Sequence, residues 1–207
     1  TGCDAHQALA LEAALETITL LKNEGGLAPL DPRRIRTLAV IGPNADRELL
    51  GGYSGRPPRT TTVLQGIRDR LGSGVKVIHA EGCRITIGGS WQQDEVVASD
   101  PEEDRRLIRQ AVAAAKDADV IVLAIGGNEQ TSREAWSLKH LGDRASLGLV
   151  GRQDELVAAM VATGKPVVAL LFNGRPLAIQ KLAETVPVIF ECWYLGQETG
   201  PAVAAAL

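Results

Sequence analysis

The chain has 207 residues and a formal net charge of −3, with 45% hydrophobic residues but only 3% aromatic ones. This length suffices for one sizeable core, and the charge provides no basic field that would attract nucleic acid or an anionic membrane surface. No apolar run approaches the length needed to span a bilayer.

The cysteines and histidines predict neither a metal site nor a cofactor site. The spacing of Cys3, Cys83 and Cys192 fits no zinc motif, and the three histidines are scattered along the chain. The chain begins abruptly within one predicted helix and ends within another, so we expect it to be a piece of a longer protein.

Helical and strand patterns alternate along the chain. Apolar residues at helical spacing predict a first helix that runs to Lys22 and ends at the glycines that follow. Asp100, Pro101 and Glu103 mark a helix start, with Asp100 as the N-cap. In chain order, the predicted elements are helix 5–22, strand 37–41, helix 62–71, strand 75–80, helix 100–115, strand 120–125, helix 151–163, strand 167–172, helix 177–182, strand 188–191 and a last helix that begins within 192–198.

This alternation predicts the fold class. The strand at 120–125 is apolar throughout and rich in β-branched residues, which indicates burial on both faces in the middle of a parallel sheet. Strands that alternate with helices form such sheets with helices on both faces. We therefore expect an α/β fold over residues 1–207, a three-layer sandwich with a mostly parallel sheet of five or six strands.

Each unusual polar segment directly follows a predicted strand. The segments are 42–46, 126–144, 173–176 and 191–198. Because the carboxyl ends of parallel strands lie at one edge of a sheet, we expect these segments to meet there and to form the functional site. The first of them lacks a nucleotide-binding fingerprint, and Pro43 removes a backbone donor that a phosphate would need, which argues against a nucleotide site.

The segment 126–144 is the richest in acids, bases and aromatics. A carboxylic acid in a partly dry pocket beside a tryptophan has a raised pKa and can donate a proton, which makes Glu129 and Glu134 candidates. Arg133 would act in the opposite direction if it paired with Glu134. We expect Asp143 and Arg144 to form an ion pair that braces the loop. The alternative is that all these side chains are solvated loop charges without a catalytic role.

Seven stretches of the chain, taken together and in order, resemble the second domain of glycoside hydrolase family 3, of the β-xylosidase/β-glucosidase type. These stretches are ITLLKNEG at 18–25, LAPL at 27–30, AVIGPNAD at 39–46, GGYSG at 51–55, GKPVV at 164–168, NGRPL at 173–177 and WYLGQE at 193–198. Members of this family are exo-acting β-glycosidases, chiefly β-glucosidases, β-xylosidases and N-acetylglucosaminidases. Their barrel-shaped first domain carries an aspartate nucleophile, and their second domain is an α/β sandwich that lends a loop to the active site.

The resemblance implies that Glu134 is the acid/base of a retaining mechanism, with no cofactor. One departure from the family pattern keeps Glu129 as an alternative: many relatives have Gly-x-Asp-Arg almost directly after the glutamate, whereas residues 136–141 intervene here. Trp136 would pack on a sugar ring at the leaving-group side, or else anchor its loop. Arg175 and Glu198 are expected to satisfy loop backbone groups.

The implied partners are a β-linked glucoside or xyloside oligosaccharide and an N-terminal barrel domain of the same chain, which these residues do not include. No nucleic acid or membrane partner is expected, and the family suggests a periplasmic or secreted location. The competing interpretation is a non-catalytic carbohydrate-binding or interdomain scaffold module with the same fold.

Overall fold

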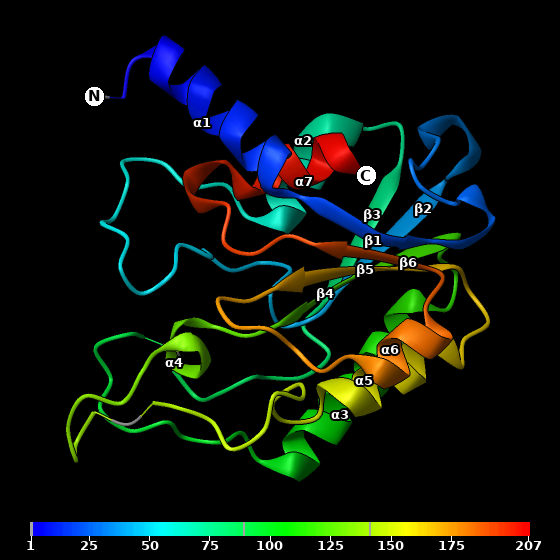
Figure 1. Ribbon diagram of the computed structural model, residues 1–207. Helices are drawn as coiled ribbons and strands as arrows, with labels where there is room; N and C mark the ends of the chain where they lie inside the picture. The colour runs from blue at the N-terminus through cyan, green and yellow to red at the C-terminus, as the bar shows by residue number, and fades with distance from the viewer. Residues whose placement is uncertain (1, 89, 141) are drawn as a thin grey trace.

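The computed structural model describes residues 2–88, 90–140 and 142–207. The described residues form one six-stranded sheet in the order β1-β6-β5-β4-β2-β3, with helices on both faces (Figure 1). The strands are β1 (Thr19–Asn23), β2 (Thr37–Ile41), β3 (Lys76–Ala80), β4 (Val120–Gly126), β5 (Val167–Phe172) and β6 (Val188–Glu191). The α-helices are α1 (Asp4–Thr17), α2 (Val63–Leu71), α3 (Pro101–Ala115), α4 (Glu129–Ser132), α5 (Gln153–Val161), α6 (Gln180–Thr185) and α7 (Thr199–Ala206).

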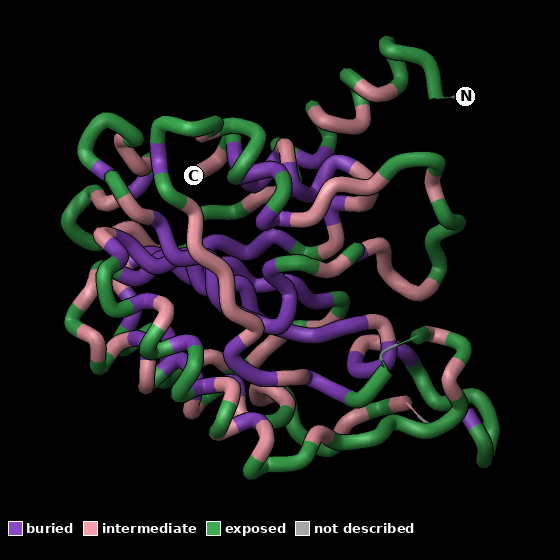
Figure 2. Tube along the Cα trace, turned by 180° about the vertical axis from the view of Figure 1, so that it is seen from behind, coloured by how far each residue is buried: buried purple, intermediate pink, exposed green. Residues whose placement is uncertain are grey.

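The molecule has three layers, as the alternating pattern predicts. Helices α1, α2 and α7 lie on one side of the sheet and α3, α5 and α6 on the other (Figure 1). Successive residues of each strand point to opposite faces, so Val122 packs in the core beneath α2 and α7 while Leu123 packs in the core beneath α3 and α5. The purple centre of Figure 2 is this doubly covered sheet. Burying apolar surface on both faces is the main stabilisation of such a fold.

Strand β4 lies inside the sheet and is buried along its whole length. It pairs in parallel with β2 on one side and with β5 on the other. This position confirms the prediction made for residues 120–125, because a strand covered on both faces by helices can tolerate only apolar side chains. The N-cap predicted at Asp100 is also confirmed, since its side chain accepts a hydrogen bond from the Glu102 amide at 2.9 Å.

The prediction of one continuous helix over residues 5–22 is wrong. Helix α1 ends at Thr17, and Thr19–Asn23 forms strand β1, which runs antiparallel to β6 at the edge of the sheet. The β-branched residues Thr17, Ile18 and Thr19 favour the extended backbone, and β6 supplies an unpaired edge for it. This strand makes the sheet mostly rather than wholly parallel.

Several helix boundaries also differ from those predicted. Helix α5 begins at Gln153 rather than 151, and α6 covers Gln180–Thr185 rather than 177–182. The last helix, α7, begins at Thr199, after a short 3-10 turn at Gly196–Glu198. Among the helices of the described ranges, none has both the length and the apolar character needed to cross a membrane.

Candidate functional site

The polar segments that follow the strands meet at the carboxyl edge of the sheet, as predicted. The Asn44 side chain donates to the Gly127 carbonyl at 3.0 Å, which joins the segment after β2 to the segment after β4. Ser132 lies 2.7 Å, Oγ to Oη, from Tyr194 and accepts a hydrogen bond from the Gly174 amide at 3.3 Å. The segments after four strands thus form one connected surface.

A sharp turn at Gly126 starts the segment that carries both candidate acids. Its φ of 132° is open to glycine but strained for other residues, and a Cβ there would lie 2.1 Å from the carbonyl oxygen of Phe172. Two residues later Asn128 and Thr131 form a capping box that starts the short helix α4. The chain therefore leaves the central strand in a defined direction.

Arg133, the residue before Glu134, is a buried anchor with 1% of its surface exposed. Its guanidinium donates to the backbone carbonyls of Trp91 (2.6 Å), Gln93 (2.6 Å) and Asp94 (2.9 Å). Burial lowers the pKa of Arg133, and the charge of Asp94 opposes that shift. The side chain thus ties the stem of the loop to the irregular segment before α3.

Arg175 holds the same stem from the other side. It donates to the carbonyls of Ser132 at 3.2 Å and Arg133 at 2.6 Å, which confirms its predicted role as a donor to loop backbone. It also lies 3.5 Å from Asp143. The ion pair expected between Asp143 and Arg144 is therefore wrong: the Asp143 carboxylate faces Arg175, while Arg144 turns away and donates to the Gly148 carbonyl.

Glu198 also departs from its prediction. Its carboxylate accepts hydrogen bonds from the side chains of Arg59 (2.9 Å) and Gln197 (3.0 Å) rather than from loop backbone. Because the group is buried, pairing with an arginine compensates for the loss of hydration.

The residues inserted after Glu134 form a closed excursion. The Asp143 amide donates to the Arg133 carbonyl at 3.2 Å, so the chain returns to the point that it left. Gly142 lies so close to this point that a Cβ on it would be 2.4 Å from the Glu134 carbonyl carbon. The Gly-x-Asp-Arg pattern, displaced in the sequence, is thus next to Glu134 in space.

Glu134 is exposed at the base of this excursion. In the part of the chain that the structure describes, its carboxylate has neither a hydrogen bond nor an ion pair. The backbone on its N-terminal side is fixed by Arg133 and Arg175, but its own side chain is available to a ligand.

Glu129 lies in different surroundings. It is partly buried in a hollow of about 380 Å³ whose lining includes Gly52, Trp91 and Gln92. Burial raises the pKa of Glu129, and the positive charge of Arg47 opposes this shift. The structure thus separates the two candidate carboxylates, one exposed at the stem of the loop and one inside a hollow.

All the tryptophans and tyrosines of the chain belong to segments at this edge, although only Trp136 is a candidate site residue from the sequence. Trp136 is 72% exposed and its ring lies 4.9 Å from that of the buried His140. The His140 ring lies 5.9 Å from Trp91, which in turn lies 4.9 Å from Tyr53. In a chain so poor in aromatics, these side chains gather on the loops of one edge. The set is Tyr53, Trp91, Trp136, Trp193 and Tyr194.

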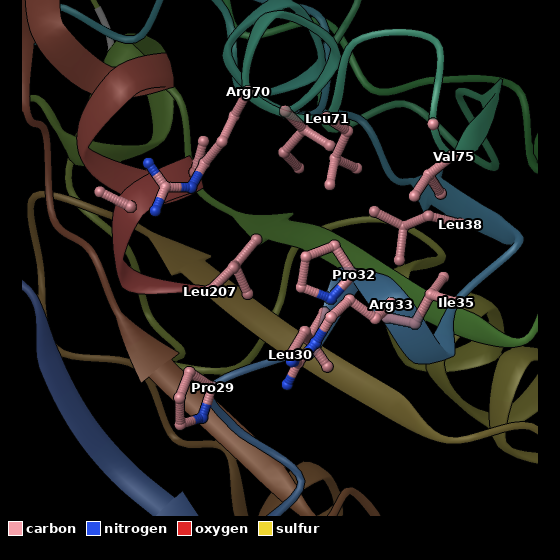
Figure 3. Close-up of a pocket in the computed structure, with 14 residues that line it drawn as sticks. Pro29, Leu30, Pro32, Arg33, Ile35, Leu38, Arg70, Leu71, Val75 and Leu207 are labelled. Atoms are coloured by element: carbon pink, nitrogen blue, oxygen red, sulfur yellow. The ribbon is translucent and has the colours of Figure 1, made fainter.

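A larger hollow, of about 570 Å³, lies at the opposite edge of the sheet, near the amino ends of β2 and β3 (Figure 3). Its wall is apolar and includes Leu38, Leu71 and Val75, and its charged residues are Arg33 and Arg70. Among the described residues, no Asp or Glu side chain lines it, so it offers no side-chain carboxyl for acid/base chemistry. Across the described ranges, no three His, Cys, Asp or Glu side chains are arranged so that they could hold a metal ion.

Comparison with known proteins shows which family the chain matches. Residues 18–207 match the model of the glycosyl hydrolase family 3 C-terminal domain. A β-xylosidase from Formosa agariphila is 44% identical over 99% of this chain and 26% of its own length. A periplasmic β-glucosidase from Salmonella typhimurium is 37% identical over 98% of this chain and 26% of its own length.

Solved structures similar to this chain are also a β-glucosidase and a β-xylosidase. A β-glucosidase from Erythrobacter marinus superposes with a TM-score of 0.92 at 42% identity, covering 99% of this chain and 28% of that one. An exo-β-xylosidase bound to a xylobiose-derived probe superposes with a TM-score of 0.78 at 32% identity, covering 97% of this chain and 23% of that one. The chain therefore spans about a quarter of the length of the curated relatives it matches.

Proposed function

This chain belongs to glycosyl hydrolase family 3, as a C-terminal domain, and we propose that it supplies the acid/base carboxyl of a retaining, exo-acting β-glycosidase. The observation that carries the proposal is the position of Glu134. Its carboxylate is exposed at the carboxyl edge of the sheet without a partner among the described residues, while two arginines fix the backbone just before it.

Glu134 suits a proton donor better than Glu129 does. A general acid must reach the oxygen of the bond that breaks, so its carboxyl has to project from the protein surface into the active site. The exposure of Glu134 supports this role, whereas Glu129 is partly enclosed by its own domain. The closed excursion also supports Glu134 over the alternative, Glu129, because Gly142 and Asp143 return to the Glu134 stem.

In the proposed mechanism, an aspartate of an N-terminal barrel domain attacks the anomeric carbon of the terminal sugar. Glu134 donates its proton to the leaving oxygen and then, as a carboxylate, takes a proton from the water that releases the sugar. The two carboxyl groups of a retaining enzyme lie about 5–5.5 Å apart. Packing of the barrel over the exposed Glu134 would exclude water from the site of proton transfer.

The substrate is a β-linked glucoside or xyloside oligosaccharide, a proposal supported by the names of the similar β-xylosidase and β-glucosidase. Trp136 is proposed to pack on the sugar at the leaving-group side, and its exposure leaves the ring free for that contact. A barrel domain in the same polypeptide is supported by the length of the similar β-xylosidase, of which this chain spans only 26%. A periplasmic location is supported by the Salmonella relative.

Chemical rescue tests the role of Glu134. In the intact enzyme, Glu134→Ala should be nearly inactive on an aryl β-glycoside, and azide should restore turnover because it attacks the glycosyl-enzyme intermediate without needing a general base. The product should be a glycosyl azide of retained β configuration, identified by NMR. Glu95→Ala, which removes an exposed carboxylate outside the excursion, is the matched control. Azide that restores nothing in Glu134→Ala, with the protein folded, would favour a non-catalytic scaffold.

The domain alone is expected to hydrolyse nothing. It carries the proposed acid/base but neither the proposed nucleophile nor the barrel that would hold the sugar, and loss of a nucleophile alone lowers turnover by several orders of magnitude. The measurement is release of nitrophenol from aryl β-glucosides and β-xylosides by the purified 207-residue chain. Turnover above the uncatalysed rate would mean that this chain holds a complete catalytic pair, contrary to the proposal.

A further inference from the structure

The hollow that contains Glu129 is built by segments far apart in the sequence. The loop around Gly52 forms one side, the segment around Trp91 forms another, and Glu129 enters from the start of α4. Ser54 and Gln92 add polar groups to its lining. The hollow therefore combines an aromatic residue with several hydrogen-bonding groups, which is the usual make-up of a small-ligand site.

Trp91 fixes the shape of this hollow. Its indole packs directly on Gly52, where a Cβ would lie 1.9 Å from the ring, and on Tyr53. The Trp91 carbonyl accepts a hydrogen bond from Arg133, the anchor beside Glu134. Arg133 thus contacts the backbone of Trp91, in the wall of the hollow, and directly precedes the proposed acid/base Glu134.

The charges of the hollow favour a neutral ligand rich in hydroxyl groups. No described side chain donates a hydrogen bond to the Glu129 carboxylate, so it has acceptor capacity to offer. Glu48 adds a second acid to the lining, and Arg56 lies 3.6 Å from it. The lining thus has two carboxylates and one guanidinium, a net negative charge that disfavours an anion, whereas sugar hydroxyls can donate to the carboxylates.

Ring contacts through His140 link Trp136, on the excursion, to Trp91 in the wall of the hollow. The Trp136 ring contacts His140, and His140 contacts Trp91, which lines the hollow. A ligand in contact with both Trp136 and the hollow must extend past the buried His140 that separates them. It must therefore be longer than the single sugar proposed to stack on Trp136.

We propose that this hollow binds the second sugar unit on the leaving-group side of a β-linked oligosaccharide, with Glu129 accepting hydrogen bonds from its hydroxyls. The inference rests on the proposed function of Glu134 and gives Glu129 a binding role in place of a catalytic one. The site selects for substrate length, because only a trisaccharide or longer substrate reaches it.

The test compares three substrates in the intact enzyme: an aryl β-glycoside, a β-linked disaccharide and the corresponding trisaccharide. Glu129→Gln should lower kcat/KM for the trisaccharide about tenfold, the loss expected when a hydrogen bond to a charged acceptor is weakened. It should change kcat/KM for the two shorter substrates less than about twofold. Glu95→Gln, an exposed carboxylate outside the hollow, should leave all three unchanged.

Binding to an inactive enzyme supplies a second readout. Calorimetry should show that Glu129→Gln, added to Glu134→Gln, weakens trisaccharide binding about tenfold and disaccharide binding hardly at all. An equal loss on all three substrates, or no loss on any, overturns the length-selecting site. If Glu134→Ala with azide behaves as expected while Glu129→Gln does not discriminate by length, this inference fails alone. If azide instead rescues Glu129→Ala, both proposals fail.

Discussion

Glu134→Gln in the intact enzyme is expected to lower kcat/KM by about 10²–10⁴-fold on a substrate with a poor leaving group, because general acid catalysis contributes that much. On an aryl glycoside with a good leaving group, the first step needs little protonation, so the formation of the glycosyl-enzyme should be far less affected. The measurement is kcat/KM across aryl β-glycosides whose phenols span several pKa units. A steeper dependence on the leaving-group pKa than in the parent enzyme is the expected signature.

Glu129→Gln is the matched control for this series, since it removes the other candidate acid of the same segment. Its dependence on the leaving-group pKa should be that of the parent enzyme. The opposite pattern, with Glu129→Gln steep and Glu134→Gln flat, would transfer the acid/base role to Glu129. Small and equal losses in both variants would favour the scaffold interpretation.

Gly126→Ala is expected to destabilise the domain by about 2–5 kcal/mol, combining backbone strain with a clash in a packed interior. The residue ends the central strand with a φ of 132°, and the new Cβ would approach the Phe172 carbonyl oxygen to 2.1 Å. That oxygen already accepts the Gly127 amide, so a shift would also disturb the pairing of β4 with β5. Urea denaturation of the chain measures the free energy of unfolding.

Gly164→Ala provides the comparison, because Gly164 also has a positive φ, of 71°, but nothing lies within 4 Å of its Cβ position. It should cost only about 1 kcal/mol, the penalty of the left-handed backbone alone. Equal losses in the two variants would show that the close approach to Phe172 contributes nothing.

The fold could be predicted from the sequence because its signals are local. The apolar run at 120–125 and the alternation of helices with strands predict the sheet and its layers. Strand β1 was missed because its identity depends on β6, which is more than 160 residues away, and its apolar residues also fit a helical spacing. Pairing with a distant edge overrides local propensity here.

The candidate site was predictable only as a region. Sequence order places 126–144 after the central strand, so its location at the carboxyl edge follows from the topology. The contacts that define the site do not follow from the topology. Arg133 donates to backbone carbonyls at 91–94, and because every residue has such a carbonyl, the sequence does not show which ones accept. For the same reason, the expected Asp143–Arg144 pair was an inference from adjacency, whereas the actual partner, Arg175, lies 32 positions further on.

The closed excursion after Glu134 has a consequence for how the length of this loop can change. Its two ends are joined at Arg133 and Asp143, so its span is independent of how many residues lie between them. Trp136 and the 98% exposed Leu138 project from it into the surroundings of the domain. Residues can therefore be gained, lost or exchanged in this projection, altering what it reaches, while the carboxyl group at its base keeps its place.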